Sequence, residues 1–241
     1  MALPKIDAPV YEIVLPLSKK TIKYRPFLVK EQRNLLMAME SNDYSTIEQN
    51  IKQVLQNCTQ TPGINFDDLP VIDIEYYFLQ LRARSVGEIA ENKYICNNEV
   101  DGVECGATME ASINLLEIKV DDIDESRDVI KLNDRFTIKM TYPKFSIVNR
   151  AGAIDNVNDF AFQMIADSIE YIHDGDQFYY AKEATKEELM DFVEQLNQEQ
   201  FTKLEDFFSN LPKLRKAFDV TCKKCGHVHH IEVEGLESFF G

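Results

Sequence analysis

Apolar and polar positions change their period along the first third of the chain. Residues 11–15 and 21–25 alternate between the two kinds, and the short polar stretch between them predicts a β-hairpin. From residue 29 the apolar positions recur every three or four residues, as they do on the buried face of a helix. This pattern predicts helices at about 29–40, 45–60 and 71–84, each followed by short polar residues, glycine or proline.

Single residues predict where some of these helices begin and which face they bury. Ser45-Thr46-Ile47-Glu48 has the capping-box pattern, so we expect the second helix to begin there. Thr185-Lys186-Glu187-Glu188 has the same pattern and predicts another helix start. The first helix is expected to bury a set of apolar side chains, namely Leu35, Leu36, Met37 and Met39.

The remainder of the chain mixes strands with helices. Alternation returns after residue 87, and the helical period resumes near residue 160. Residues 119–128 are acidic and predict a solvated loop, because their spacing does not fit a calcium-binding loop. The expected strands are 89–95, 108–118, 129–132, 135–140, 178–180, 218–221 and 227–233, and the expected helices are 160–172, 185–196 and 199–209.

The order of these elements predicts an α+β fold. No repeat, low-complexity tract or Gly/Ser linker divides the 241 residues, and one elaborate domain can hold a chain of this length. We therefore expect a single domain, 1–241, with an N-terminal β-hairpin and a helical body of about 29–86 and 154–212. A split, zinc-ribbon-like β module is expected from about 88–118 and 216–234.

Four cysteines form two half-sites of a metal-binding pattern. Eight residues separate Cys96 from Cys105, and two separate Cys222 from Cys225. In both pairs a glycine follows the second cysteine. The first gap is longer than usual, but a turn at Asp101-Gly102 would bring its two sulfur atoms together. Four thiolates complete a structural zinc site and leave no position for a catalytic water. The predicted ligands of a structural Zn²⁺ are Cys96, Cys105, Cys222 and Cys225.

Other interpretations of these residues remain open at this point. His227, His229 or His230 could replace one cysteine as a ligand, or serve a metal-dependent enzyme. A redox-active CxxC pair is disfavoured, because no thioredoxin-like βαβ pattern surrounds Cys222. Thiols without metal are the plainest alternative. Cys58 falls in a helical segment and is expected to be a small core residue.

The charge balance limits the classes of partner. With 41 acidic and 26 basic residues the net charge is −15, which argues against binding to a phosphate backbone. A local basic cluster nevertheless keeps a nucleic-acid-binding zinc ribbon as the alternative function. No run of 18 apolar residues indicates a membrane span, and no signal peptide is evident, so we expect a cytoplasmic protein. The basic cluster consists of Lys213, Arg215, Lys216, Lys223 and Lys224.

Segments 1–7, 24–31, 35–41, 73–88 and 235–240 resemble the baseplate hub assembly proteins of T-even-type bacteriophages, with 73–88 the most similar. The resemblance implies a non-enzymatic protein that assists hub assembly or belongs to the hub, with no catalytic residues. Its implied partners are other hub or tail proteins, and an oligomer is allowed. Nucleic acid is not expected as a partner, because of the net charge. It would act in the host cytoplasm during assembly or remain in the virion baseplate.

The last residues of the chain carry an apolar pattern of their own. Leu236, Phe239 and Phe240 have the spacing of helical residues that enter a groove on a partner. We expect them to bind a partner protein, and the alternative is that they pack against the protein's own sheet.

Overall fold

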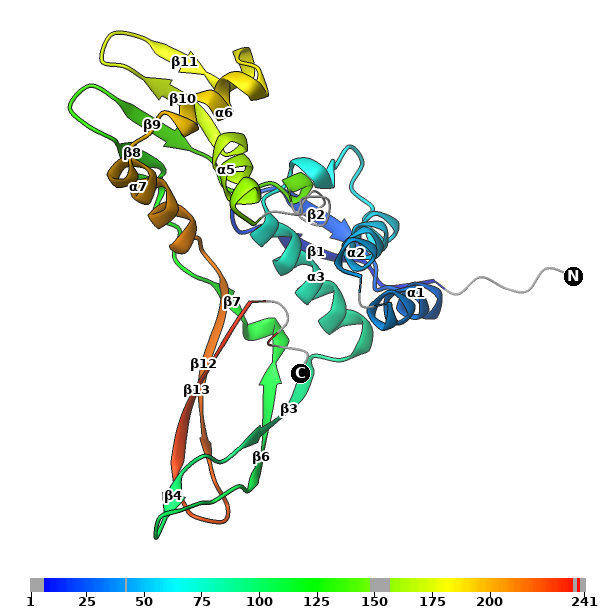
Figure 1. The fold of residues 1–241 in the computed structure, drawn as a ribbon. Coiled ribbons are helices and arrows are strands. Elements are labelled where there is room, and N and C mark those ends of the chain that lie inside the picture. Colours follow the sequence, from blue (N-terminus) through cyan, green and yellow to red (C-terminus); the bar gives the residue numbers. More distant parts are fainter. Residues whose placement is uncertain (1–6, 42, 148–156, 236–237, 239–241) are drawn as a thin grey trace, which may run out of the picture.

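The structure is a computed structural model, and it describes residues 7–41, 43–147, 157–235 and 238. Figure 1 shows three parts with different architecture. We call residues 7–86 the N-terminal lobe, residues 125–142 with 157–211 the sheet lobe, and residues 89–120 with 214–234 the β arm. The arm projects away from both lobes, and its far end lies at the bottom of the view.

The N-terminal lobe packs a hairpin against helices. Strands β1 (Tyr11–Val14) and β2 (Thr21–Tyr24) are antiparallel, as predicted. Helices α1 (Val29–Glu40), α2 (Tyr44–Cys58) and α3 (Val71–Val86) follow, with the short helix η1 (Phe66–Asp68) before α3. Their shared core combines aliphatic and aromatic side chains, and it includes Leu15, Ile22, Tyr24, Val54, Leu55, Phe66, Leu69, Ile74, Tyr77 and Leu81.

Two details of this lobe differ from the prediction. The capping box at Ser45 is wrong, because the carboxylate of Asp43 accepts the Thr46 backbone N–H at 3.2 Å and caps α2 from there. The expected buried face of α1 is also wrong. Leu36, Met37 and Met39 are 54%, 59% and 59% exposed.

Glu31 explains how α1 is turned. This buried carboxylate accepts the Leu28 backbone N–H at 2.7 Å and pairs with Arg25 at 3.0 Å. Residues three, four and seven positions apart share a helix face, so Glu31 brings half-buried Leu35 and buried Ala38 inward with it. A polar anchor therefore decides which side of this helix meets the core.

The sheet lobe carries an antiparallel sheet in the order β11-β10-β9-β8, with helices on one side (Figure 1). The predicted hairpin is present as β8 (Val129–Lys131) and β9 (Thr137–Met140), and the predicted short strand is β11 (Phe178–Tyr180). Helices α6 (Lys186–Glu194) and α7 (Gln198–Ser209) agree with the prediction, and Thr185 caps α6 in a capping box.

The helix expected over 160–172 is wrong in its second half. Helix α5 (Val157–Asp167) ends earlier, and Ile169–His173 form strand β10. The apolar residues after the helix fit the period of a helix as well as that of a strand. In the structure they form β10, which pairs with β9 on one side and β11 on the other. Tertiary pairing thus decides an element that periodicity alone leaves ambiguous.

The β arm consists of two long hairpins that face each other. Strand β3 (Ile89–Ile95) pairs with β6 (Thr108–Asn114), and β12 (Leu214–Thr221) pairs with β13 (Val228–Glu234). The short strands β4 (Glu99–Val100) and β5 (Val103–Glu104) form a small hairpin between the first pair. The helix η2 (Leu115–Glu117) follows β6.

The acidic connector is more ordered than a solvated loop. Strand β7 (Lys119–Val120) pairs with β12, and η3 (Glu125–Asp128) forms a short helix, so the loop prediction is wrong at both ends. Asp121 accepts the Arg215 side chain at 2.9 Å and the Lys213 backbone N–H at 3.2 Å. Opposite charge on β12 therefore fixes this acidic segment.

These parts are held by separate hydrophobic clusters. The helices expected to form one body divide between a cluster in the N-terminal lobe and another in the sheet lobe. A third cluster joins α3, through Ile72, Leu79 and Ala83, to the base of the β arm. The predicted α+β class is confirmed, with the N-terminal hairpin and the cysteines on separated strands. The boundaries within the chain remain a prediction.

Among the residues that the structure describes, no helix is long and apolar enough to cross a membrane.

Candidate metal centre

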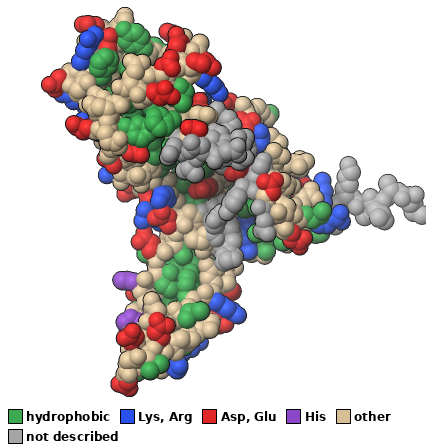
Figure 2. All heavy atoms as spheres, in the orientation of Figure 1, with side chains coloured by type: hydrophobic (Ala, Val, Ile, Leu, Met, Phe, Trp, Pro, Cys, Tyr) green, Lys and Arg blue, Asp and Glu red, His purple; other side chains and the backbone are tan. Residues whose placement is uncertain are grey.

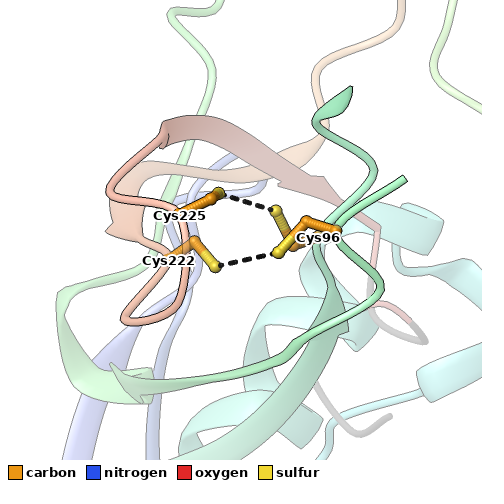
Figure 3. A group of neighbouring side chains, drawn as sticks. Cys96, Cys222 and Cys225 are labelled. Atoms are coloured by element: carbon orange, nitrogen blue, oxygen red, sulfur yellow. Dashed lines mark hydrogen bonds between the residues drawn. The ribbon is translucent and has the colours of Figure 1, made fainter. Parts of the chain in front are cut away.

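Four cysteine sulfur atoms converge where the two hairpins of the arm meet. All ligand atoms of Cys96, Cys105, Cys222 and Cys225 lie within 4.8 Å of one another. The sulfur atoms of Cys96 and Cys225 are 3.6 Å apart, and those of Cys105 and Cys222 are 3.8 Å apart. Figure 3 shows Cys222 and Cys225 on one loop, facing Cys96 on the other. Sequence reasoning thus selected four residues that the fold brings together.

Backbone hydrogen bonds shape each cysteine loop around its sulfur atoms. In the second loop, the Cys222 N–H donates to His227 O at 2.8 Å and the Gly226 N–H donates to Cys222 O at 2.9 Å. In the first loop, the Gly106 N–H donates to Cys96 O at 3.0 Å. Gly106 and Gly226 have φ of 62° and 75°, a left-handed conformation that glycine adopts without strain.

The long gap in the first half-site is closed by the β4–β5 hairpin. Asp101 and Gly102 have φ of 53° and 77°, as expected for the two central residues of a tight hairpin turn. The Cys105 N–H then donates to Asn98 O at 2.8 Å, which returns the chain to the cluster. The predicted turn therefore explains why a gap of unusual length still yields a paired half-site.

The donor set fits a tetrahedral metal ion with soft ligands. The five cysteines are free thiols in this structure, and three of the four in the cluster are buried. A tetrahedral zinc with sulfur ligands at about 2.3 Å requires sulfur atoms about 3.8 Å apart. The two separations given above lie close to this value. Cysteine thiolates select zinc and other soft ions, so the cluster can hold a metal.

The surroundings treat the thiols differently. The backbone N–H of Cys225, joined by that of Lys224, donates towards the Cys222 sulfur and lowers the pKa of this thiol to about 6. Burial raises the pKa of the Cys96 thiol to about 12. The backbone of the second loop thus favours the thiolate form of one cysteine, and burial disfavours it in another; a bound metal cation would favour the thiolate form of both.

Polar side chains outside the four cysteines also reach the sulfur atoms. His229 Nε2 lies 3.2 Å from Cys96 Sγ, and Asn98 Nδ2 donates to Cys225 Sγ at 3.7 Å. Lys224 Nζ donates to Cys105 O at 2.8 Å. The sequence analysis did not predict the hydrogen bond from Asn98 to a cysteine sulfur. The one sign of it in the sequence is that Asn98 lies between Cys96 and Cys105.

The three histidines differ in their relation to the cluster. His229 contacts Cys96, and the rings of His227 and His229 pack against each other with centroids 4.7 Å apart. His230 points to Asp219 instead. The four convergent ligand atoms are all sulfur, so replacement of a cysteine by histidine is not needed to complete the set.

Cys58 lies elsewhere and has a different role. It is the last residue of α2, fully buried in the core of the N-terminal lobe, where burial raises the pKa of its thiol to about 11. The prediction of a small core cysteine is confirmed.

Most of the predicted basic cluster is neutralised by acidic neighbours. Arg215 pairs with Asp121 at 2.9 Å, Glu232 at 2.6 Å and Glu234 at 3.0 Å. Lys213 also pairs with Glu234, and Lys216 pairs with Glu117 at 3.2 Å. These side chains therefore balance charge along the arm.

The proposed partner-binding residues Leu236, Phe239 and Phe240 lie outside the described residues. Ser238, between them, is described, and its carbonyl accepts the Asn92 side chain at 3.2 Å.

The geometry defines a class of protein: an α+β protein whose two distant hairpins meet at a cysteine cluster. A family model described as "T4 bacteriophage base plate protein" matches residues 8–241. The chain therefore belongs to the T4 bacteriophage base plate protein family, and the resemblance found in the sequence is confirmed at this level. No curated protein and no solved structure gives a significant match.

Proposed function

We propose that the chain is a non-enzymatic assembly factor or structural component of the phage baseplate hub. Family membership over residues 8–241 supports a role in the baseplate, and the projecting β arm supports action through protein–protein contacts. It would act in the host cytoplasm while the baseplate assembles, together with other hub or tail proteins.

We further propose that Cys96, Cys105, Cys222 and Cys225 hold a structural zinc ion. The observation that carries this proposal is the convergence of their sulfur atoms within 4.8 Å. In such sites the free energy of metal binding contributes to the free energy of folding. Zinc would therefore hold the two hairpins against each other and so fix the direction of the arm. The split β module would then behave as one unit.

The pairing of the basic residues favours protein partners over nucleic acid. A nucleic-acid-binding ribbon needs free Lys and Arg side chains for phosphate contacts, whereas Arg215 alone has three carboxylate partners. Filter binding to DNA and RNA at increasing salt tests this alternative. Retention that falls steeply with salt would favour it.

The donor set also favours a structural over a catalytic metal. Four sulfur ligands leave no position for water, and His229 contacts a cysteine rather than an open site. Replacement of His227, His229 and His230 by alanine should preserve phage assembly. Loss of assembly with unchanged metal content would instead support a role in chemistry.

Metal content and assembly test the main proposal together. Purified protein should contain about one zinc per chain by mass spectrometry, and cobalt substitution should give the absorption of a tetrahedral thiolate complex. Cys96→Ser/Cys222→Ser should lose both the metal and phage production. Cys58→Ala is the matched control, because it removes a buried thiol outside the cluster. Metal-free protein with full assembly activity would contradict the proposal.

The C-terminal residues Leu236, Phe239 and Phe240 remain a proposed partner contact. Deletion of residues 238–241 should then leave the melting temperature unchanged and lower the yield of assembled baseplates. A large fall in the melting temperature would instead assign them to the protein's own core.

A further inference from the structure

The β4–β5 hairpin lies between Cys96 and Cys105 in the chain and forms the far end of the arm (Figure 1). We call residues 97–104 the finger. Its base is fixed by the backbone bonds of Cys105 and Gly106 described above, so its direction follows that of the cluster. Every finger side chain except the half-buried Asn98 is exposed, and none belongs to a hydrophobic cluster among the described residues.

The finger exposes apolar side chains in adjacent positions. Val100 and Val103 are directly opposite each other in the β4–β5 ladder, and they are 47% and 69% exposed. Ile95, at the end of β3, is 74% exposed. A single exposed apolar residue is ordinary, but neighbouring ones at the end of a projection mark a surface suited to contact with another protein.

The same finger carries an unfavourable arrangement of charge. Glu99 and Glu104 are directly opposite in the ladder, and like charges at such positions destabilise a strand pair. Asp101 adds a third carboxylate at the turn. Among the described residues, none of these three carboxylates forms an ion pair within the chain. Figure 2 shows acidic side chains at this end of the arm, with basic and apolar ones beside them.

A basic residue beside the base of the finger is engaged elsewhere. Lys224, on the facing cysteine loop, directs its Nζ to Cys105 O at 2.8 Å. Folding alone gives no reason for the opposed glutamates, since glutamine at either position would remove the repulsion. Residues that destabilise their own local structure, as these opposed like charges do, are expected mainly at functional sites.

We infer that the finger docks on another baseplate protein at a surface where basic residues surround an apolar depression. Val100 and Val103 would enter the depression, and Glu99, Asp101 and Glu104 would pair with Lys or Arg around it. Charge complementarity selects this partner, because a basic surface relieves the repulsion that the free finger retains. The inference rests on the proposed function, in which the chain acts by contacting baseplate proteins.

Charge neutralisation separates docking from stability. In the phage that encodes the chain, Glu99→Gln/Glu104→Gln should lower the yield of infectious particles at least tenfold. The melting temperature of the purified protein should stay the same or rise, because the repulsion is gone. A variant that is at least as stable but fails in assembly is the result expected of a docking surface. Unchanged yield would overturn the inference.

Charge reversal gives a larger effect and can identify the partner surface. Glu99→Lys/Glu104→Lys should lower the yield further, and second-site suppressors should replace Lys or Arg by acidic residues in one other baseplate protein. The control Asp191→Lys/Glu205→Lys makes the same change of net charge on exposed positions of α6 and α7 and should leave the yield unchanged. An equal loss in the control, or suppressors that map only within this chain, would overturn the inference.

Two further outcomes would assign the finger to another occupant and also overturn the inference. One is finger-dependent self-association of the purified protein by light scattering, which would point to a second copy. The other is calorimetric binding of Ca²⁺ or Mg²⁺ that the Gln variant loses. Failure of the finger variants to affect yield, while Cys96→Ser/Cys222→Ser still blocks assembly, would leave the proposed function standing.

Discussion

The N-terminal lobe and the far end of the β arm are held together in different ways. The lobe buries large aromatic side chains in contact with one another, with the Tyr24 and Tyr77 ring centroids 5.3 Å apart. The cluster at the arm's end consists of the four cysteines with buried Met109, Ala111 and Val220, and its larger side chains, Tyr94, Phe218 and Ile231, are only partly buried. We therefore expect apolar burial to hold the lobe, and the arm's end to depend more on its cysteine cluster.

Because of this difference, the far end of the arm can unfold while the N-terminal lobe stays folded, although the arm is packed against the lobe at its base. Its base shares a cluster with α3, and the Tyr94 and Phe218 rings, 6.1 Å apart, join the two hairpins further along. Beyond them the cysteine loops and a small buried group that includes Met109, Ala111 and Val220 connect the hairpins. Loss of a bound metal should thus loosen the far end first and leave the lobe folded.

Metal removal should have the largest effect. Apparent binding free energies of structural zinc sites are about 10–16 kcal/mol, so a chelator or Cys96→Ser/Cys222→Ser removes most of what holds the two loops. Hydrogen exchange should accelerate strongly in β3, β6, β12 and β13 near the cluster, with α2 and α3 unchanged. Acidification should act in the same direction, because protonated thiols do not bind the metal.

The matched control for this experiment is Cys58→Ala. It should leave the metal content and the exchange of the arm unchanged, although it truncates a core residue of the lobe. Uniform acceleration across both regions after metal loss would show that the two parts unfold together, and the comparison would then be wrong.

Truncation of Tyr77 should destabilise the N-terminal lobe and leave the far end of the arm unchanged. This ring is fully buried, packs against Tyr24 and Phe66, and its hydroxyl is 2.8 Å from Thr59 Oγ1. Tyr77→Ala should lower the stability of the N-terminal lobe by about 3–5 kcal/mol, as large-to-small changes in aromatic cores do. Exchange in α2 and α3 should accelerate while the zinc content per chain stays the same. Tyr77→Phe, which keeps the ring, should cost about 1 kcal/mol.

The same contrast explains what could be predicted from the sequence. The cysteine spacing and its glycines identify the arm's cluster, because metal ligation needs particular residue types at particular places. Periodicity identifies most helices, but it misses the orientation of α1, which the buried Glu31 decides, and the strand β10, which its neighbours decide. Those two features depend on tertiary contacts that a local pattern does not contain.

Removal of the Asp73 carboxylate should destabilise the N-terminal lobe less than truncation of Tyr77 does. This fully buried carboxylate accepts the backbone N–H groups of Leu17 at 2.8 Å and Ser18 at 2.9 Å, and so attaches the loop after β1 to α3. Asp73→Ala leaves two donors without a partner, and we expect a loss of about 2–3 kcal/mol in chemical denaturation. The exposed Asp68→Ala is the control and should change stability by less than about 0.5 kcal/mol. A similar loss in both variants would contradict the role assigned to Asp73.

Gly226 should give the smallest effect, and it reports on the arm alone. Its φ of 75° is strained for any residue with a side chain, although a Cβ there would meet no atom within 4 Å. Gly226→Ala should therefore cost about 1 kcal/mol through backbone strain without a steric clash. Because this residue closes the Cys222 loop, the loss should appear as roughly fivefold weaker zinc binding in a chelator competition. Gly63→Ala makes the same change at the same φ in the N-terminal lobe, and its cost should appear there, with zinc affinity unchanged. Equal zinc affinities in the two variants would show that the loop around Cys222 adjusts without help from its glycine.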